Sequence, residues 1–508
     1  MGKDHNKLIV RNTIFMAIRM VLLLGISLYT SRVVLQVLGV EDYGIYNVVA
    51  GFVSMFAFLN SSMTNANQRF YNYELGKDNT LGVNNVYNTS LRIQTFLALI
   101  IIILTETIGL WYLYEKMVIP PERINAAFWV FQFSVLSLLF IVFQIPYSAA
   151  VIAYEKMDYY AYVGIIDAFL KLIIALAIPY AKGDQLIVYG FLLLLINIIN
   201  WCLYFFYAKY HFKILKFQSN SHWNLFKKML GFSAWNCFGI FSTVFREQGA
   251  NMLLNLFFGP VVNAARAIAY QVAGALESFV LNITTASRPQ LIQTYVKGET
   301  DRMIHIMHGV SKLCFLFVYC ISLPIMLEVD YVLKLWLGDT IPGHTNTFMV
   351  LVVIASLVRV FHPMTSHIVH ATGKMRLFQV TNGILNLILI PIVYILLYMG
   401  YRPESIFVLF ILMNIIIQIV SWMILHRLVP EFSVIIYLRQ VVLPLCVVIV
   451  LSILLPYFFH VKMDSGFIRL FVVLLSSIVS IVIFGFFMAL SRNEREMVMG
   501  YVNKMRKA

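Results

Sequence analysis

The sequence predicts an all-α polytopic membrane protein of about fourteen transmembrane helices, arranged as two six-helix bundles followed by two additional helices. Three observations carry this prediction. Hydrophobic residues make up 60% of the 508 residues and charged residues only 12%, which is roughly half the charged fraction of a soluble domain. Apolar stretches of about 20 residues recur to the end of the chain. The second half also repeats landmarks of the first, which is typical of many transporters.

Each apolar stretch is long enough to cross about 30 Å of hydrocarbon as a helix. The first half contains six, near residues 13–38, 44–66, 91–114, 124–152, 160–181 and 185–208. The second half contains eight, near residues 229–257, 261–286, 304–327, 346–370, 377–399, 404–426, 437–459 and 467–490. Because the stretches between 229 and 286 are the least apolar, the count of fourteen carries a margin of about one pair.

These stretches divide the chain into four expected parts. Residues 1–208 form the N-terminal bundle, 209–228 a basic cytosolic linker, 229–430 the C-terminal bundle, and 431–508 two further helices with a basic tail. The first stretch has no small-residue cleavage site after it, so we expect a retained helix and not a signal peptide. Other loops are too short for a soluble catalytic domain, and we therefore expect no enzyme activity.

The net charge of +14 does not indicate nucleic-acid binding, because the basic residues alternate between loops instead of gathering on one accessible face. With the N-terminus placed in the cytosol, roughly 25 Lys and Arg residues lie in cytosolic segments and roughly 7 in outer loops. The positive-inside rule then places both termini in the cytosol. The five cysteines lie inside apolar stretches without metal-ligand spacing, so we expect neither metal nor cofactor.

Matched features recur about 220 residues apart, which indicates an internal repeat. Leu38-Gly39 matches Phe258-Gly259, and Arg69 matches Arg288. Pro146 before Ala153-Tyr154-Glu155-Lys156-Met157 matches Pro363 before Ala371-Thr372-Gly373-Lys374-Met375. Six stretches separate equivalent positions, so the two halves have the same orientation and are related by a pseudo-two-fold axis along the membrane normal.

The sequence resembles a known transporter family over essentially its whole length, and two segments carry the resemblance. The segment from Ser31 to Tyr46 resembles the first-helix exit of polysaccharide flippases in the multidrug, oligosaccharidyl-lipid and polysaccharide exporter superfamily. The segment from Arg246 to Gln271, with Gln248-Gly249, Leu254-Asn255 and Asn263-Ala264-Ala265-Arg266, is similar to the seventh and eighth helices of a bacterial branch associated with polysaccharide or lipopolysaccharide biosynthesis.

This resemblance implies a V-shaped pair of bundles that alternate between inward-open and outward-open states in a bacterial plasma membrane. The implied function is a flippase that moves a polyprenyl-pyrophosphate-linked oligosaccharide from the cytosolic to the outer leaflet. The implied partners are the lipid-linked glycan, membrane lipid, and a glycan polymerase or glycosyltransferase, with the flippase itself a monomer.

Ionisable residues inside the membrane cost about 2.5–3.5 kcal/mol each on insertion scales, so each needs a partner, a wet cavity or a function. We expect arginines to bind the pyrophosphate, because a guanidinium stays charged and can bond two phosphate oxygens. The candidates are Arg19, Arg32, Arg246 and Arg266. For Arg32 and Arg266 the alternative is a side chain that reaches the headgroups.

Three amides on the seventh stretch, Gln248, Asn251 and Asn255, share one helical stripe. They could bind sugar hydroxyls, or bond neighbouring helices together. Asp167 and Lys171 have the spacing of a salt bridge on one helix face, with a gate or ion-coupling element as the alternative. Glu106 and Glu247 are further candidates for ion coupling, and Glu277 and Arg359 complete the set of intramembrane charges.

Two other functions stay open on the sequence alone. A multidrug antiporter of the same superfamily would need cavity carboxylates for organic cations, whereas the membrane region holds six basic and four acidic residues. A membrane glycan polymerase or ligase would need a large outer loop, and no loop here is large enough. The flippase is therefore the leading hypothesis.

Overall fold

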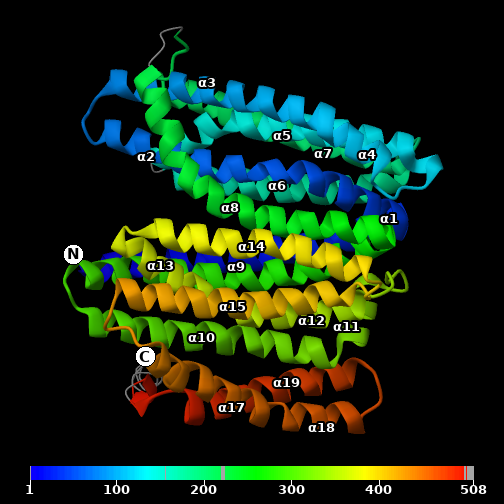
Figure 1. Ribbon diagram of the computed structural model, residues 1–508, viewed down its shortest axis with the longest axis vertical. Coiled ribbons are helices and arrows are strands. Elements are labelled where there is room, and N and C mark those ends of the chain that lie inside the picture. The colour runs from blue at the N-terminus through cyan, green and yellow to red at the C-terminus, as the bar shows by residue number, and fades with distance from the viewer. Residues whose placement is uncertain (1, 155, 219–222, 493, 497–498, 500–508) are drawn as a thin grey trace. The chain divides into compact units, whose positions relative to one another are not determined.

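A computed structural model of the chain is helical throughout its ordered elements (Figure 1). It describes residues 2–499 except 155, 219–222, 493 and 497–498, and side chains are described for all of these but 2–22, 57, 59, 61, 157, 232–236, 286 and 289. No strand occurs in the described part of the chain. The expected all-α class is confirmed.

Helices of the first half are joined by short turns. They are α1 (Gly2–Ser54), α2 (Phe58–Leu75), α3 (Thr80–Leu104), α4 (Leu110–Glu115), α5 (Ile124–Ala153), α6 (Met157–Ala177) and α7 (Gln185–His211). A π-helical turn, Thr105–Gly109, continues α3 into α4.

The second half begins with two long helices and ends with shorter ones. Its helices are α8 (Trp223–Phe258), α9 (Pro260–Val296), α10 (Thr300–Leu327), α11 (Val329–Leu337), α12 (Thr345–Arg359), α13 (His362–Thr372), α14 (Met375–Tyr398), α15 (Glu404–Leu428), α16 (Val434–Tyr437), α17 (Leu443–Ser452), α18 (Leu454–Lys462) and α19 (Phe467–Phe484).

Eleven helical stretches within the described residues are long and apolar enough to cross a membrane. The helices α2, α8 and α9 are not among them, because polar side chains interrupt their apolar surface. The count of fourteen therefore stays a prediction. Two of these three helices, α8 and α9, carry five of the seven polar residues that we expected to bind substrate, and the other two, Arg19 and Arg32, lie on α1.

The chain packs as two compact units, residues 1–267 and 268–508. In the first unit, α5 lies along α7 and α2, and α8 packs against α1, α2 and α3. In the second unit, α12 packs against α15, and α10 packs against α19. The boundary between these two units falls inside α9. It differs from the boundaries of the sequence repeat, so the bundles expected to end at residue 208 and to begin at residue 229 stay a prediction.

The backbone repeats its irregular positions at the expected distance along the chain. Gly39 interrupts α1 with φ of 78°, and Gly259 separates α8 from α9 with φ of 77°. Lys156 and Lys374 precede α6 and α14 with nearly the same backbone angles. Positive φ strains a residue with a Cβ, so glycine at both helix breaks is a requirement of the repeated backbone.

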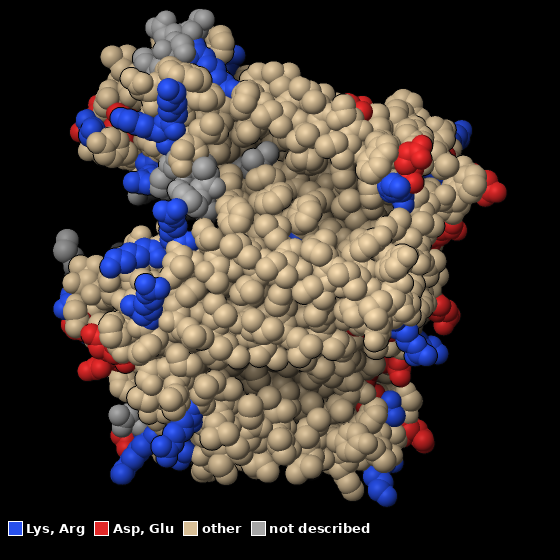
Figure 2. Space-filling model, viewed as in Figure 1, with Lys and Arg blue, Asp and Glu red and all other residues tan. Residues whose placement is uncertain are grey.

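Charged side chains are segregated along the helices of each unit. On the face shown in Figure 2, Lys and Arg gather at one end of the helices, most Asp and Glu lie at the other, and the band between them carries almost no charge. A charge-free band of this kind suits the hydrocarbon core of a bilayer.

Close helix packing around Gly44 fixes the start of α9 in the first unit. A Cβ atom on Gly44 would collide with the backbone carbonyl of Pro260. Backbone cannot move aside as the end of a flexible side chain can. Only glycine therefore allows the second part of α1 to approach α9 this closely.

We predict that Gly44→Ala destabilises the protein by about 1–3 kcal/mol, the usual cost of overpacking. The measurement is thermal unfolding of the purified chain in detergent, followed by intrinsic fluorescence. Gly274→Ala is the matched control, because a Cβ there meets no atom within 4 Å. Equal unfolding midpoints for the two variants would contradict the packing argument.

An ionic clamp at the start of α5 joins three segments of the first unit. Arg123 donates from Nε to Asp42 Oδ1 at 2.8 Å and from Nη1 to Asp184 Oδ2 at 2.6 Å. Asp184 also caps α7, since its Oδ1 accepts hydrogen bonds from the backbone of Leu186 and Ile187. Burial alone would raise the pKa of Asp184, but the bonds from Arg123 and the α7 backbone outweigh it and hold that pKa below 3.8.

This lowered pKa predicts an acid-dependent loss of stability. A carboxyl group whose pKa is lower in the folded state stabilises the fold above its unfolded pKa, and the contribution disappears as pH falls through the folded value. Between pH 6 and pH 3, the unfolding midpoint of the wild type should therefore fall further than that of Asp184→Asn. If the unfolding midpoints of the two proteins fell equally with pH, the ionisation of Asp184 would contribute nothing to stability.

Candidate functional site

A buried ionic cluster joins α8 to α9 in the unit of residues 1–267. Arg246 Nη2 donates to Glu247 Oε1 at 2.6 Å. Arg266 Nη2 donates to the backbone carbonyl of Glu247 at 2.8 Å and to its Oε2 at 3.3 Å. The positive φ at Gly259 reverses the chain between the two helices, so residues on α8 and α9 can face each other.

The cluster brings two buried guanidinium groups to one carboxylate. Arg246 is 3% exposed and Arg266 6% exposed, and one carboxylate, that of Glu247, pairs with both guanidinium groups. Buried charges are costly unless paired and hydrogen-bonded. Two guanidinium groups held on one carboxylate also present the kind of donors that bond phosphate oxygens.

The other two predicted arginines, Arg32 and Arg19, lie on α1. Arg32 is half-buried on α1. The side chain of Arg19 lies outside the described residues, so its expected role stays a prediction. The structure brings together Arg246, Arg266 and Glu247, although Glu247 was expected in ion coupling and not as their shared partner.

The predicted amide stripe is engaged in helix packing. Asn251 donates to the Asn47 carbonyl at 3.1 Å and accepts from Asn263 at 2.8 Å. Asn255 bonds both the N–H and the carbonyl of Val118, at 2.9 and 3.2 Å. Both amides are nearly inaccessible, at 2% and 0% exposure, whereas Gln248 is half-buried. Their role in sugar binding stays a prediction, and the helix-bonding alternative describes their present contacts.

The predicted ion-coupling residues form two smaller groups in the first unit. Asp167 accepts from Lys171 at 2.7 Å and from Asn200 on α7 at 2.8 Å. Glu106 lies in the π-helical turn and accepts from Gln132 at 3.3 Å. Single π turns are frequent at functional sites. Each carboxylate has a polar partner, and coupling by either of them stays a prediction.

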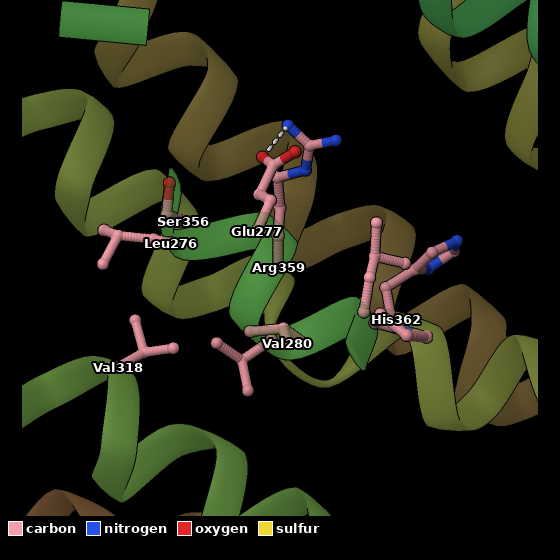
Figure 3. Close-up of a pocket in the computed structure, with 10 residues that line it drawn as sticks. Leu276, Glu277, Val280, Val318, Ser356, Arg359 and His362 are labelled. Atoms are coloured by element: carbon pink, nitrogen blue, oxygen red, sulfur yellow. Dashed lines mark ion pairs between the residues drawn. The ribbon is translucent and has the colours of Figure 1, made fainter. Parts of the chain in front are cut away.

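A polar pocket of about 220 Å³ opens between α9, α10, α12 and α13 in the second unit. Glu277 of α9 and Arg359 at the end of α12 form an ion pair of 2.8 Å within it (Figure 3). Ser356 and His362 also line the pocket, and the remaining walls are mostly aliphatic. Sequence analysis identified both charges but had no signal for their pairing, because 82 residues separate them.

The second unit also contains an apolar recess of about 570 Å³. Its walls come from α10, α12, α15 and α17, and no polar atom is exposed inside it. Its lining includes Phe315, Tyr319, Phe361, Trp422, Leu445 and Cys446. Sequence analysis missed this recess, because apolar residues that line it look the same as those that face lipid.

Comparison with known proteins rests on structure, because no protein-family model and no curated protein sequence matches the chain. The lipid II flippase MurJ, in an inward closed conformation, superposes with a TM-score of 0.70 at 14% identity, covering 93% of this chain and 98% of MurJ. An inward-facing multidrug resistance MATE transporter superposes at 0.69 and 16% identity, covering 80% of this chain and 96% of the transporter. The chain has the fold of the MOP superfamily.

A third MOP superfamily structure, a transporter from Pyrococcus furiosus described as having a binding pocket of reversed polarity, superposes at a TM-score of 0.59 and 16% identity, covering 82% of this chain and 95% of that one. The expected fold is thus confirmed, and the eleven long apolar helical stretches of the described residues make the chain a multi-pass membrane protein. At these sequence identities the structural similarity to MOP proteins establishes the fold and does not identify the substrate.

We predict that Glu247→Ala destabilises the protein by about 3–5 kcal/mol, because it leaves two buried guanidinium groups without their shared carboxylate. Thermal unfolding measures the loss. Adding inorganic pyrophosphate should raise the midpoint of Glu247→Ala more than that of the wild type, since the anion can replace the missing charge. Glu299→Ala, which breaks an exposed pair with Arg302, is the control. It should change neither the unfolding midpoint nor the shift of that midpoint on adding pyrophosphate.

Proposed function

We propose that the protein translocates a polyprenyl-pyrophosphate-linked oligosaccharide across the membrane by alternating access, for surface polysaccharide or lipopolysaccharide biosynthesis. The observation that carries this proposal is the apolar recess, part of which is built by α17. Helices after α15 lie beyond the twelve that form the predicted repeat. A long apolar chain needs such a surface while its polar head leaves the lipid phase.

The extra helices are integral to the second unit. Tyr437, Val441, Leu445 and Val448 belong to the same buried core as residues of α10 and α13. On the α18–α19 side, Arg469 and His460 both bond the fully buried carboxylate of Glu328, at 2.7 and 2.8 Å. A recess wall fixed in this way can keep its shape around a flexible chain, which lowers the entropic cost of binding.

The cationic cluster of α8 and α9 supplies a matching feature for the polar head. Its two guanidinium groups can bond the oxygens of a pyrophosphate, whereas they would repel an organic cation. A head with two negative charges moving outward would gain about 4–5 kcal/mol at an inside-negative potential of 100 mV. The membrane potential is therefore a sufficient energy source in principle, and ATP is not required.

The antiporter alternative is favoured by the superposition on MATE transporters and by the carboxylate of Asp167 among polar partners. Its cargo would be an organic cation, for which the buried arginines are unfavourable. The flippase proposal also carries the finer expectations of a bacterial plasma membrane, cytosolic termini, a monomeric chain, and association with a glycan polymerase or glycosyltransferase.

The proposal predicts that filling the recess slows translocation of the lipid-linked substrate. Cys446 lines the recess, and the neighbouring Val447 is exposed on α17 but does not line it. In reconstituted vesicles, Cys446→Trp should reduce the translocation rate of a polyprenyl-pyrophosphate-linked oligosaccharide at least tenfold. Val447→Trp adds the same bulk one residue away and should retain the wild-type rate.

The same vesicles test the function itself. Wild-type protein should move the lipid-linked oligosaccharide and not a cationic dye. Transport of the dye without movement of the lipid-linked substrate would replace the flippase proposal with the antiporter. Equal rates for the two tryptophan variants would remove the recess from the mechanism.

A further inference from the structure

The polar pocket of the second unit combines a charged pair with open space. Glu277 and Arg359 point toward each other across one side of the pocket (Figure 3), and their side chains are 37% and 33% exposed. In contrast, the carboxylate of Glu328 has no exposed surface and bonds Arg469 and His460. The first pair is accessible to a ligand, whereas the second is closed within the protein.

The pair is also absent from the equivalent place in the first half. By the spacing of the repeat, Glu277 corresponds to Ala57 and Arg359 to Val142. A salt bridge that the shared architecture required would be expected in both halves. The pair is therefore an addition to the second half, which indicates a role in recognition and not in folding.

The backbone differs at the same position. In the first half, α5 continues as one helix through Pro146. In the second half, α12 ends at Arg359 and α13 begins at His362, just before the equivalent Pro363. Val360 and Phe361 keep right-handed helical angles, so the interruption is a kink, and Arg359 and His362 on either side of it line the pocket. Helices interrupted at membrane depth are tolerated where they line a cavity, and transporters use them to build binding sites.

The chemistry of the pocket selects for a neutral polar ligand. A guanidinium group donates hydrogen bonds and a carboxylate accepts them, so together they match a pair of neighbouring hydroxyl groups. A phosphate would be repelled by Glu277, and an organic cation by Arg359. Leu276, Val280 and Val318 provide aliphatic contacts for the C–H face of a sugar ring.

We propose that the Glu277–Arg359 pocket binds one neutral sugar residue of the transported glycan. This inference rests on the proposed flippase function and names a subsite for its head, separate in residues from the cationic cluster of α8 and α9. The 2.8 Å contact keeps the two side chains oriented next to each other, so that a diol can bond both without displacing either.

Binding of free sugars to the detergent-purified full chain tests the pocket. The probes are glucose, galactose, mannose and N-acetylglucosamine, with inorganic pyrophosphate as the anionic comparison, measured by ligand-observed NMR titration. At least one sugar should bind the wild type, and Glu277→Gln and Arg359→Gln should each weaken it at least tenfold. Pyrophosphate affinity should stay within twofold in both variants. Arg302→Gln, in an exposed pair of the same unit, should change neither.

Three results would overturn the pocket proposal. In the first, the wild type binds none of the sugars. In the second, both Gln variants bind sugar as tightly as the wild type. In the third, Arg359→Gln loses pyrophosphate binding and Glu277→Gln binds pyrophosphate more tightly. The last would identify an anion site. Arg359→Lys is the control for misfolding, because lysine keeps the positive charge but lacks the planar fork of a guanidinium group. This variant should bind sugar weakly and unfold at the same midpoint as the wild type.

Translocation in vesicles separates this inference from the function on which it rests. If the wild type moves the lipid-linked oligosaccharide and the variants retain both transport and sugar binding, the pocket proposal fails and the flippase stands. If the wild type binds sugar through Glu277 and Arg359 but moves no lipid-linked substrate, the pocket stands and the flippase fails.

Discussion

The cost of placing charge in an apolar interior governs this structure. Glu247 is shared between two buried guanidinium groups, and Glu328 is bonded by Arg469 and His460. On α10, the 4%-exposed Lys312 pairs with Glu494 at 3.0 Å. Each of these groups would be expensive to bury alone, because removing one partner leaves an uncompensated charge. Pairing therefore fixes which helices must lie together, and it leaves only selected charges open to a ligand.

Pairing also explains what could and could not be predicted from the sequence. The helical class, the repeat and the glycine breaks follow from local signals, because hydrophobic length and positive φ are properties of short segments. Partners follow from tertiary packing instead. Arg246 and Arg266 were recognisable as candidates, but nothing local shows that Glu247 bonds both, or that Asn255 bonds the backbone of Val118. The apolar recess was invisible for the same reason, since its lining and a lipid-facing surface have the same composition.

The repeat shows how one architecture can hold two different sets of side chains. At the start of the fourth repeated helix, Arg123 pairs with Asp184 in the first half, and His344 pairs with Glu404 in the second. The pair therefore occupies the same place in both halves, although its residue types differ. At another position the acidic group is missing from the second half. Asp167 lies three residues after Gly164, and the residue three positions after the equivalent Gly383 is Asn386. Links that persist in both halves are those that the shared fold needs.

Differences between the halves are therefore the better guide to function. The ion pair of Glu277 and Arg359, the helix kink beside it and the recess built with α17 all belong to the second unit, and Ala57 and Val142 stand where the repeat would place the ion pair in the first half. The two buried guanidinium groups that share Glu247 belong to the first unit. A lipid-linked glycan has three chemically distinct parts: an apolar chain, an anionic pyrophosphate and neutral sugars. An organic cation would leave most of these features without a purpose, and that is the physical argument for the larger, three-part substrate.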